Sequence, residues 1–179
     1  MPQLLNIIDE NDNIIGEGTR EEIHKNGLLH REVHVWIFND KEEILFQRRA
    51  AGADNFPNLL DASVGGHVEI GDSYEKTALK ELREETGIKA NEEDLIFLVK
   101  MHRSVFDEVT GATNNAMRSV YAYRYNGGIE DLKPERGVGF EFWPIKKVLN
   151  LEESEKKRFI PGVLSKEFVE IFEAIDLLA

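Results

Sequence analysis

Residues 65–88 read GGHVEIGDSYEKTALKELREETGI and form the most informative part of the chain. Asp72 or Ser73 is suited to cap the N-terminus of a helix, and Gly87 is suited to the left-handed position that follows a helix. The apolar face of the helix between them would consist of Ala78, Leu79 and Leu82. These residues predict a glycine-rich loop followed directly by an amphipathic helix.

Three glutamates of the predicted helix lie at positions i, i+3 and i+4, namely Glu81, Glu84 and Glu85. At this spacing their side chains point to one side of the helix. Three like charges repel each other unless a cation lies among them, and oxygen ligands in this number suit Mg²⁺ or Mn²⁺. The alternative interpretation is a solvated acidic helix face, which is the usual role of a glutamate-rich run.

Residues 66–88 resemble the signature of the Nudix hydrolase family, G-x(5)-E-x(7)-R-E-U-x-E-E-x-G-U, in which U is an aliphatic residue. Two positions depart from the signature: Asp72 replaces its first glutamate, and Lys80 replaces its arginine. Both changes keep the charge, although lysine cannot make the bidentate contact to a carboxylate that arginine makes. The matching residues are Gly66, Glu81, Leu82, Glu84, Glu85, Gly87 and Ile88.

The resemblance implies a pyrophosphohydrolase that uses Mg²⁺ or Mn²⁺. Its catalytic residues and carboxylate ligands would be Glu81, Glu84 and Glu85. The carbonyl of Gly65 would be a further metal ligand, and Glu135 is best placed for the additional acidic residue that many Nudix enzymes supply from a loop before the last core strand. Glu141 is an alternative to Glu135. Glu135 itself is equally well interpreted as a surface residue. The general base stays open between Glu81 and a glutamate outside the signature.

The rest of the chain mixes predicted strands and helices. Hydrophobic alternation and turn residues predict strands at 4–8, 13–17, 34–38, 43–47, 95–101, 118–125 and 140–145, the first four as two hairpins. A C-terminal helix is expected at about 165–177. This order is compatible with the fold that the resemblance implies, an α+β protein with a Nudix-type α/β/α sandwich and a mixed β-sheet. We expect a single Nudix domain over residues 1–179, with an N-terminal hairpin at about 4–17.

Residues 4–146 also resemble the Nudix branch that contains isopentenyl-diphosphate isomerases and their hydrolytic relatives. The isomerases use a catalytic cysteine and a metal site of histidines and glutamates. Gly65 stands here in place of the cysteine, and Asn114 and Ala116 stand in place of two glutamates. We therefore expect hydrolysis of a nucleoside diphosphate derivative or a prenyl diphosphate. An isomerase-like enzyme and a non-catalytic ligand-binding module are the alternatives.

The histidines allow more than one interpretation. In the isomerases, histidines that correspond to His67 and approximately to His24 and His30 bind metal. Their presence here is either a relic or a second metal site, and His67 could instead bind a substrate phosphate. His34 is more simply a residue of the strand at 34–38.

Arginines near predicted strand ends are candidates to bind the phosphates, because arginine makes bidentate contacts to phosphate. Arg48 and Arg49 are adjacent, so strand alternation sends them to opposite faces, and we favour Arg48. Arg118 is a further candidate.

The chain has 179 residues, a formal net charge of −12 and no cysteine. Nucleic acids and anionic membranes need a basic face, so we expect neither as a partner and expect a small-molecule diphosphate substrate instead. The lack of cysteines excludes thiol catalysis and agrees with a cytoplasmic protein. No segment has the pattern of a membrane span or a signal peptide. The oligomeric state stays open, and a homodimer is one option.

Overall fold

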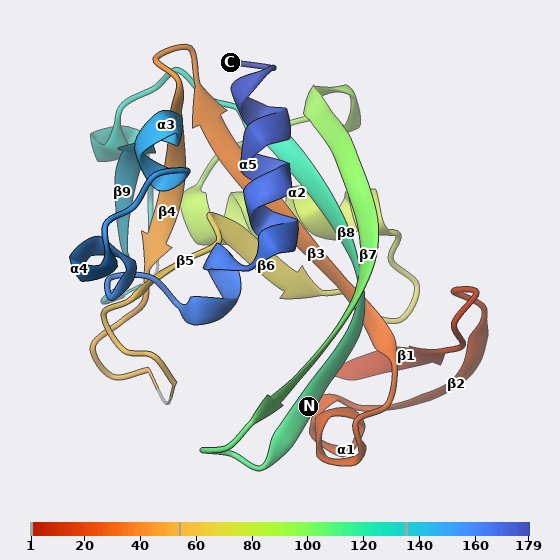
Figure 1. Ribbon diagram of the computed structural model, residues 1–179. Helices are drawn as coiled ribbons and strands as arrows, with labels where there is room; N and C mark the ends of the chain where they lie inside the picture. The colour runs from red at the N-terminus through yellow and green to blue at the C-terminus, as the bar shows by residue number, and fades with distance from the viewer. Residues whose placement is uncertain (1, 54, 135) are drawn as a thin grey trace.

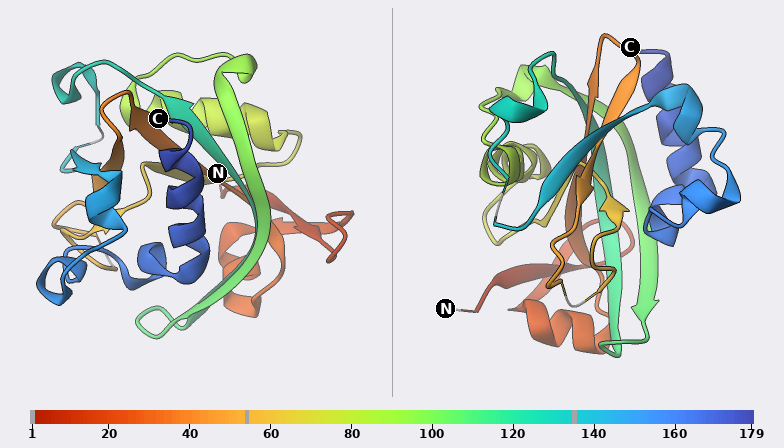
Figure 2. Two further views of the ribbon diagram at one scale, coloured as in Figure 1. Left: turned by 45° about the horizontal axis from the view of Figure 1, so that its top comes forward. Right: turned by 90° about the vertical axis from the view of Figure 1, so that its left-hand side faces the viewer.

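The computed structural model describes residues 2–53, 55–134 and 136–179, and it shows a mixed β-sheet between two helices (Figure 1). Helix α2 (Tyr74–Thr86) covers one face of the sheet and helix α5 (Lys166–Asp176) covers the other (Figure 2). Within the described residues, the sheet consists of β3 (His30–Asn39), β4 (Glu43–Arg48), β5 (Leu60–Asp61), β6 (Val64–His67), β7 (Leu95–Asp107), β8 (Ala112–Arg124) and β9 (Gly139–Pro144). This is the α/β/α sandwich that the resemblance to Nudix proteins implies, and the expected fold class is confirmed.

The strands follow the order β5, β4, β3, β8 and β7, while β6 pairs with β3 and β9 pairs with β4. Strands β3 and β8 run parallel, and the other pairs run antiparallel. In the register of β6 against β3, Gly66 is the partner of Val33 and His67 is the partner of Glu32. The glycine-rich segment is therefore a strand of the sheet and lies beside its longest buried strand.

A small N-terminal unit precedes the sheet. Strands β1 (Leu4–Ile8) and β2 (Ile14–Thr19) form an antiparallel hairpin, and helix α1 (Arg20–Asn26) follows it. The Thr19 hydroxyl accepts a hydrogen bond from the Glu22 backbone N–H at 3.2 Å, and the Glu22 carboxylate accepts one from the Thr19 N–H at 3.0 Å. This reciprocal cap begins α1, a helix that we did not predict although T-x-x-E is a known helix-start pattern.

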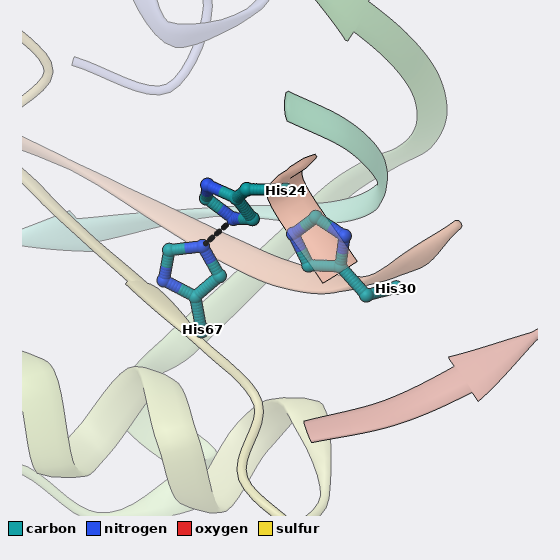
Figure 3. A group of neighbouring side chains, drawn as sticks. All are labelled: His24, His30 and His67. Atoms are coloured by element: carbon teal, nitrogen blue, oxygen red, sulfur yellow. Dashed lines mark hydrogen bonds between the residues drawn. The ribbon is translucent and has the colours of Figure 1, made fainter. Parts of the chain in front are cut away.

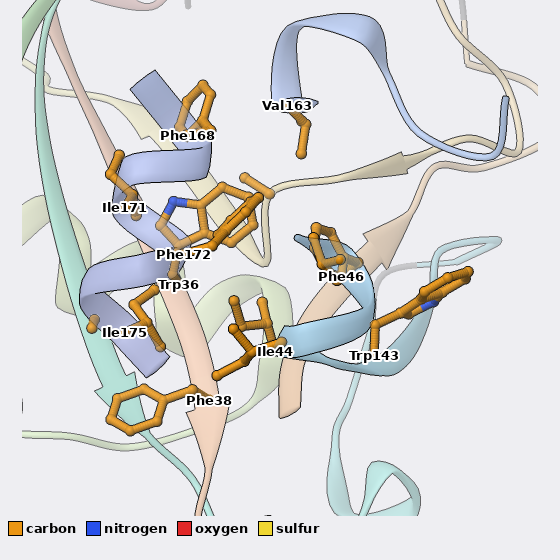
Figure 4. Packing of buried hydrophobic residues seen from close by; sticks show 14 of the residues in the cluster. Trp36, Phe38, Ile44, Phe46, Trp143, Val163, Phe168, Ile171, Phe172 and Ile175 are labelled. Atoms are coloured by element: carbon orange, nitrogen blue, oxygen red, sulfur yellow. The ribbon is translucent and has the colours of Figure 1, made fainter. Parts of the chain in front are cut away.

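The side chains of β3 alternate between two hydrophobic cores. Trp36 and Phe38 point toward α5, where the rings of Trp36 and Phe172 lie 4.9 Å apart (Figure 4). The core on the α2 side contains Val33, Val35, Ile37, Ala78 and Leu82. Neighbouring positions of β3 and β6 therefore lie on opposite faces of the sheet, which separates the two groups of polar residues described below.

The remaining elements complete the two outer layers. The hairpin of β7 and β8 is longer than the segments 95–101 and 118–125 that the pattern indicated. Two short helices, α3 (Ile145–Val148) and α4 (Glu153–Lys156), lie between β9 and α5. Among the described residues, no helix has the length and apolar character needed to cross a membrane.

Candidate active site

Helix α2 begins and ends at residues that its sequence indicates. The Ser73 hydroxyl accepts a hydrogen bond from the Lys76 backbone N–H at 3.1 Å, so Ser73 is the cap, while Asp72 forms an ion pair with the Lys76 amine at 2.5 Å. Gly87 has φ +77°, the left-handed conformation that ends the helix. The buried side chains of Tyr74, Ala78 and Leu82 fix the helix on the sheet. The side of α2 that carries the three glutamates then faces the end of β4 and the strand β6.

Three of the four glutamates of α2 lie around one open hollow of about 180 Å³. Its lining consists of Gln47, Glu81, Glu84, Glu85 and Val138. The structure thus brings together the three carboxylates that the spacing of the sequence places on one side of the helix. Carboxylate oxygens in this number fit a hard divalent cation such as Mg²⁺ or Mn²⁺.

Gly66 of β6 makes room for Glu81. A Cβ atom added at Gly66 would lie 2.3 Å from Glu81 Cδ and 2.5 Å from its Oε1, closer than two such atoms approach. The Glu81 carboxyl group therefore rests directly against the backbone of β6. This contact explains in physical terms why the signature has glycine at this position.

Gln47 positions Glu85. The Gln47 side-chain N–H donates a hydrogen bond to Glu85 Oε2 at 2.5 Å. Gln47 belongs to β4, so a residue far from the signature orients one of its carboxylates. Sequence reasoning missed Gln47, although it directly precedes the two arginines that we considered.

Lys80 supports the site from outside the hollow. Its amine forms an ion pair with Glu69 Oε2 at 3.3 Å. Burial alone would lower the pKa of Lys80, but the hydrogen bond and charge of Glu69, together with Glu84 and Glu81, raise it. Lys80 therefore stays cationic and offsets part of the repulsion among the carboxylates.

Three further residues were considered as metal ligands: Glu135, its alternative Glu141, and Gly65. Glu135 lies outside the described residues. Its alternative, Glu141, accepts hydrogen bonds from Arg158 at 2.6 Å and from the Trp143 indole N–H at 3.3 Å, so its carboxylate has protein partners. Gly65 precedes Gly66 in β6, and its role as a carbonyl ligand stays a prediction.

The two adjacent arginines lie near other partners. Arg48 Nε is 3.9 Å from Glu141 Oε1, and the Arg48 guanidinium lies against Gly139. Arg49 donates to Asp61 at 3.2 Å and to the Asn55 carbonyl at 2.9 Å. The side chain of β4 that reaches the carboxylate hollow is that of Gln47. Phosphate binding by Arg48 or Arg49 stays a prediction.

A cluster of three histidines lies on the opposite face of the sheet. His24 comes from α1, His30 from β3 and His67 from β6, and one ring nitrogen of each lies within 4.8 Å of the others (Figure 3). The Nε2 atoms of His24 and His67 are 3.0 Å apart. Because β6 alternates, His67 and Gly66 point to opposite faces, so His67 lies on the other side of the sheet from Glu81.

Glu32 lies beside His30 and His67 of this cluster and was not among our predicted residues. Its Oε2 accepts from Arg118 at 2.6 Å, and its Oε1 accepts from Asn114 at 2.7 Å and lies 3.3 Å from His67 Nε2. Burial opposes ionisation of Glu32, but the charge of Arg118 outweighs it and holds the pKa well below its usual range. Arg118, a predicted phosphate ligand, is thus buried and paired with a carboxylate. The signal for Glu32 was its spacing of two residues from His30 in a strand.

The surroundings keep His67 neutral. Burial lowers the pKa of His67 to about 3, even though Glu32 acts in the opposite direction. A neutral imidazole has one nitrogen lone pair available for a metal ion or a hydrogen bond.

A side chain at Gly65, such as the cysteine of the isomerases, would be tightly packed against His34. A Cβ atom at Gly65 would lie 3.0 Å from His34 Cδ2 and 3.3 Å from His34 Nε2. The His34 ring stacks on Phe168 of α5, with ring centroids 5.8 Å apart, and this contact holds the ring across Gly65. Asn114 and Ala116, which stand in place of the isomerase glutamates, offer no carboxylate here.

The Nudix hydrolases, which are pyrophosphohydrolases, are defined by a mixed sheet between two helices. In them, glutamates of one helix lie around a hollow beside a glycine-containing strand. The NUDIX domain family model matches residues 28–163, and the chain belongs to this family. It is 29% identical to an uncharacterized Nudix hydrolase of Clostridium acetobutylicum, over 95% of this chain and 80% of the relative. It is 36% identical to an isopentenyl-diphosphate Delta-isomerase of Photorhabdus laumondii, over 49% of each chain. A crystal structure of a Deinococcus radiodurans protein matches with a TM-score of 0.67 and 21% identity, covering 96% of this chain and 98% of that one.

Proposed function

We propose that this protein is a metal-dependent hydrolase that cleaves a diphosphate linkage in a small phosphorylated metabolite, either a nucleoside diphosphate derivative or a prenyl diphosphate. The observation that carries the proposal is the hollow lined by three carboxylates of α2. The cofactor would be Mg²⁺ or Mn²⁺, held by Glu81, Glu84 and Glu85. A protein of this acidity acts on a small molecule rather than on nucleic acid or a membrane surface.

The three carboxylates share two tasks in the proposed reaction, which are holding the cation and accepting a proton. When bound, the divalent cation neutralises the diphosphate and makes a water molecule more acidic. Glu81 is held against Gly66 and can accept the proton of the attacking water at a fixed place. Gln47 keeps Glu85 turned toward the hollow, so Glu85 and Glu84 serve to hold the cation and with it the phosphate oxygens. A glutamate outside the signature is the alternative general base.

The test is a panel of diphosphates incubated with enzyme and Mg²⁺ or Mn²⁺, with release of phosphate or pyrophosphate as the readout. We expect at least one diphosphate to be hydrolysed, activity to vanish in excess EDTA, and monophosphate esters to be poor substrates. The last expectation follows because the cation must stabilise oxygens on both sides of a bridging oxygen. Full activity in EDTA, or efficient cleavage of a simple monophosphate, would refute the proposal.

The isomerase alternative predicts a different product. We expect no dimethylallyl diphosphate when isopentenyl diphosphate is incubated with the enzyme and Mg²⁺ or Mn²⁺, measured by proton NMR. Gly65 has no group that transfers a proton, and we expect Gly65→Cys to stay inactive as an isomerase because His34 crowds that position. Accumulation of dimethylallyl diphosphate with the unmodified enzyme would show that our interpretation of Gly65 is wrong.

A further inference from the structure

We propose that the outer side of α2 binds clustered phosphate groups of a small molecule in a second hollow, separate from the carboxylate hollow. Helix α2 covers one face of the sheet, so its other side faces solvent (Figure 2). A second open hollow of about 540 Å³ lies on that side, and we call it the basic hollow. Its lining consists of Lys76, Leu79, Lys80, Arg83, Glu84, Lys89 and Ala90.

Positive charge is concentrated in the basic hollow although the protein as a whole is acidic. The chain has 22 lysines and arginines against 34 aspartates and glutamates, so most of its surface repels an anion. Among the described residues that line the basic hollow, four are cations and one, Glu84, is a carboxylate. An anionic ligand needs such a local excess of cations to bind to this protein.

Arg83 and Lys89 supply the positive charge that no carboxylate neutralises. Both residues are exposed, and within the described residues neither side chain forms an ion pair. The guanidinium of arginine is planar and donates two parallel hydrogen bonds to phosphate oxygens, while lysine binds phosphate as a point charge. We therefore assign the main phosphate contacts to these two residues.

The other two cations are oriented by neighbouring carboxylates. The Lys76 amine lies 2.5 Å from Asp72 Oδ1, and the Lys80 amine lies 3.3 Å from Glu69 Oε2. Each pair cancels most of the charge of its lysine, but an ammonium group has three N–H donors. Both amines therefore keep donors for a phosphate without breaking their ion pairs.

Leu79 gives the basic hollow an apolar surface. The sequence places Leu79 on the apolar face of the helix with Ala78 and Leu82, and those two residues are buried in the core on the α2 side. Leu79 belongs to neither core and is half-buried. Apolar surface beside a cation reduces the screening by water and so strengthens its attraction for an anion. A concave surface with apolar lining and a few charged groups is typical of small-molecule sites.

The basic hollow adjoins the proposed catalytic site. Glu84 lines both hollows, so a ligand in one lies close to a ligand in the other. The clustered phosphates can therefore come from two sources. They are either the distal part of a substrate whose diphosphate lies in the carboxylate hollow, or part of a separate phosphorylated molecule. Only the first source rests on the proposed hydrolysis.

Binding of inorganic tripolyphosphate in excess EDTA tests the site without catalysis. Without metal, the carboxylate hollow repels anions, so any binding must occur at cations elsewhere. We expect one equivalent by calorimetry, with amide chemical-shift changes concentrated in residues 76–90. Raising NaCl from about 0.05 M to about 0.5 M should weaken binding, because salt screens attraction between exposed charges. No binding, or shift changes confined to other elements, would overturn the inference.

Variants assign the contacts. We expect Arg83→Gln combined with Lys89→Gln to weaken tripolyphosphate binding by at least about tenfold, because two charge-assisted contacts are lost. The matched control is Lys156→Gln combined with Lys166→Gln, which removes two exposed cations of α4 and α5 and changes the net charge equally. It should bind like the wild type, and Tm should stay close to wild type for both variants. Equal binding by the two double variants would refute the assignment.

Kinetics with Mg²⁺ distinguish the two sources of phosphate. If the phosphates belong to the substrate, the Arg83 and Lys89 double variant should raise KM for a nucleoside triphosphate more than for the matching diphosphate, with kcat unchanged. If they belong to a separate molecule, both KM values should stay at the wild-type level while tripolyphosphate binding is still lost. If no diphosphate is hydrolysed at all, the proposed function fails, and the titration in EDTA still decides whether the basic hollow binds phosphate.

Discussion

Replacing Glu84 with glutamine is expected to reduce kcat/KM for a diphosphate substrate by at least about tenfold while the protein stays folded. Glu84 lines the hollow together with Glu81 and Glu85, and glutamine has the same shape but lacks the negative charge that attracts a divalent cation. The rate is measured over a range of Mg²⁺ concentrations, so that weaker metal binding is distinguished from slower chemistry. Glu85→Gln should have an effect of the same order.

Thermal melts of the same variant test the physical cause. Without metal, Glu84→Gln should be neutral or stabilising by about 0.2–0.5 kcal/mol, because it removes like-charge repulsion at positions i, i+3 and i+4. With saturating Mg²⁺, the wild type should gain more in Tm than the variant. The matched control is Glu173→Gln on the exposed side of α5, which should change neither activity nor the effect of Mg²⁺. Equal activity of Glu84→Gln and wild type would remove Glu84 from the site.

Helix α2 could be predicted from sequence because its signals are local. Ser73 and Gly87 mark its two ends, and the spacing of the glutamates alone puts them on one side. No such local signal marks β6, because the glycine-containing residues Val64–His67 show almost no hydrophobic alternation. Its place in the sheet is set by pairing with β3, which is a tertiary contact.

Site residues that depend on strand register were harder to predict. The sequence pointed to Arg48, but the side chain of β4 that reaches Glu85 belongs to the preceding residue, Gln47. A shift of one residue moves a side chain to the other face of a sheet, and no local pattern fixes that choice at a strand end. Glu32 was missed for a related reason, since only the pairing of β3 with β6 brings it opposite His67.

Gly66→Ala is expected to lower kcat/KM by at least about tenfold, although it adds a single methyl group. The new Cβ would lie 2.3 Å from Glu81 Cδ, so the Glu81 carboxyl group must leave its place against β6. A displacement of about 1 Å in a catalytic group can cost about a hundredfold in rate. The atom in contact belongs to the end of a flexible side chain, so the fold and the core beneath α2 should persist.

The pathway of the effect can be tested with a double-mutant cycle. If Gly66→Ala acts by moving Glu81, it should add little to the loss already caused by Glu81→Ala, whereas independent effects would multiply. Gly16→Ala is the matched control, because its Cβ would meet Ile7 at an ordinary 3.6 Å in the N-terminal hairpin. Circular dichroism and Tm should stay close to wild type for both glycine variants. Wild-type activity in Gly66→Ala would mean that the place of Glu81 against β6 is not needed for the reaction, and the general base would then have to be sought outside the signature.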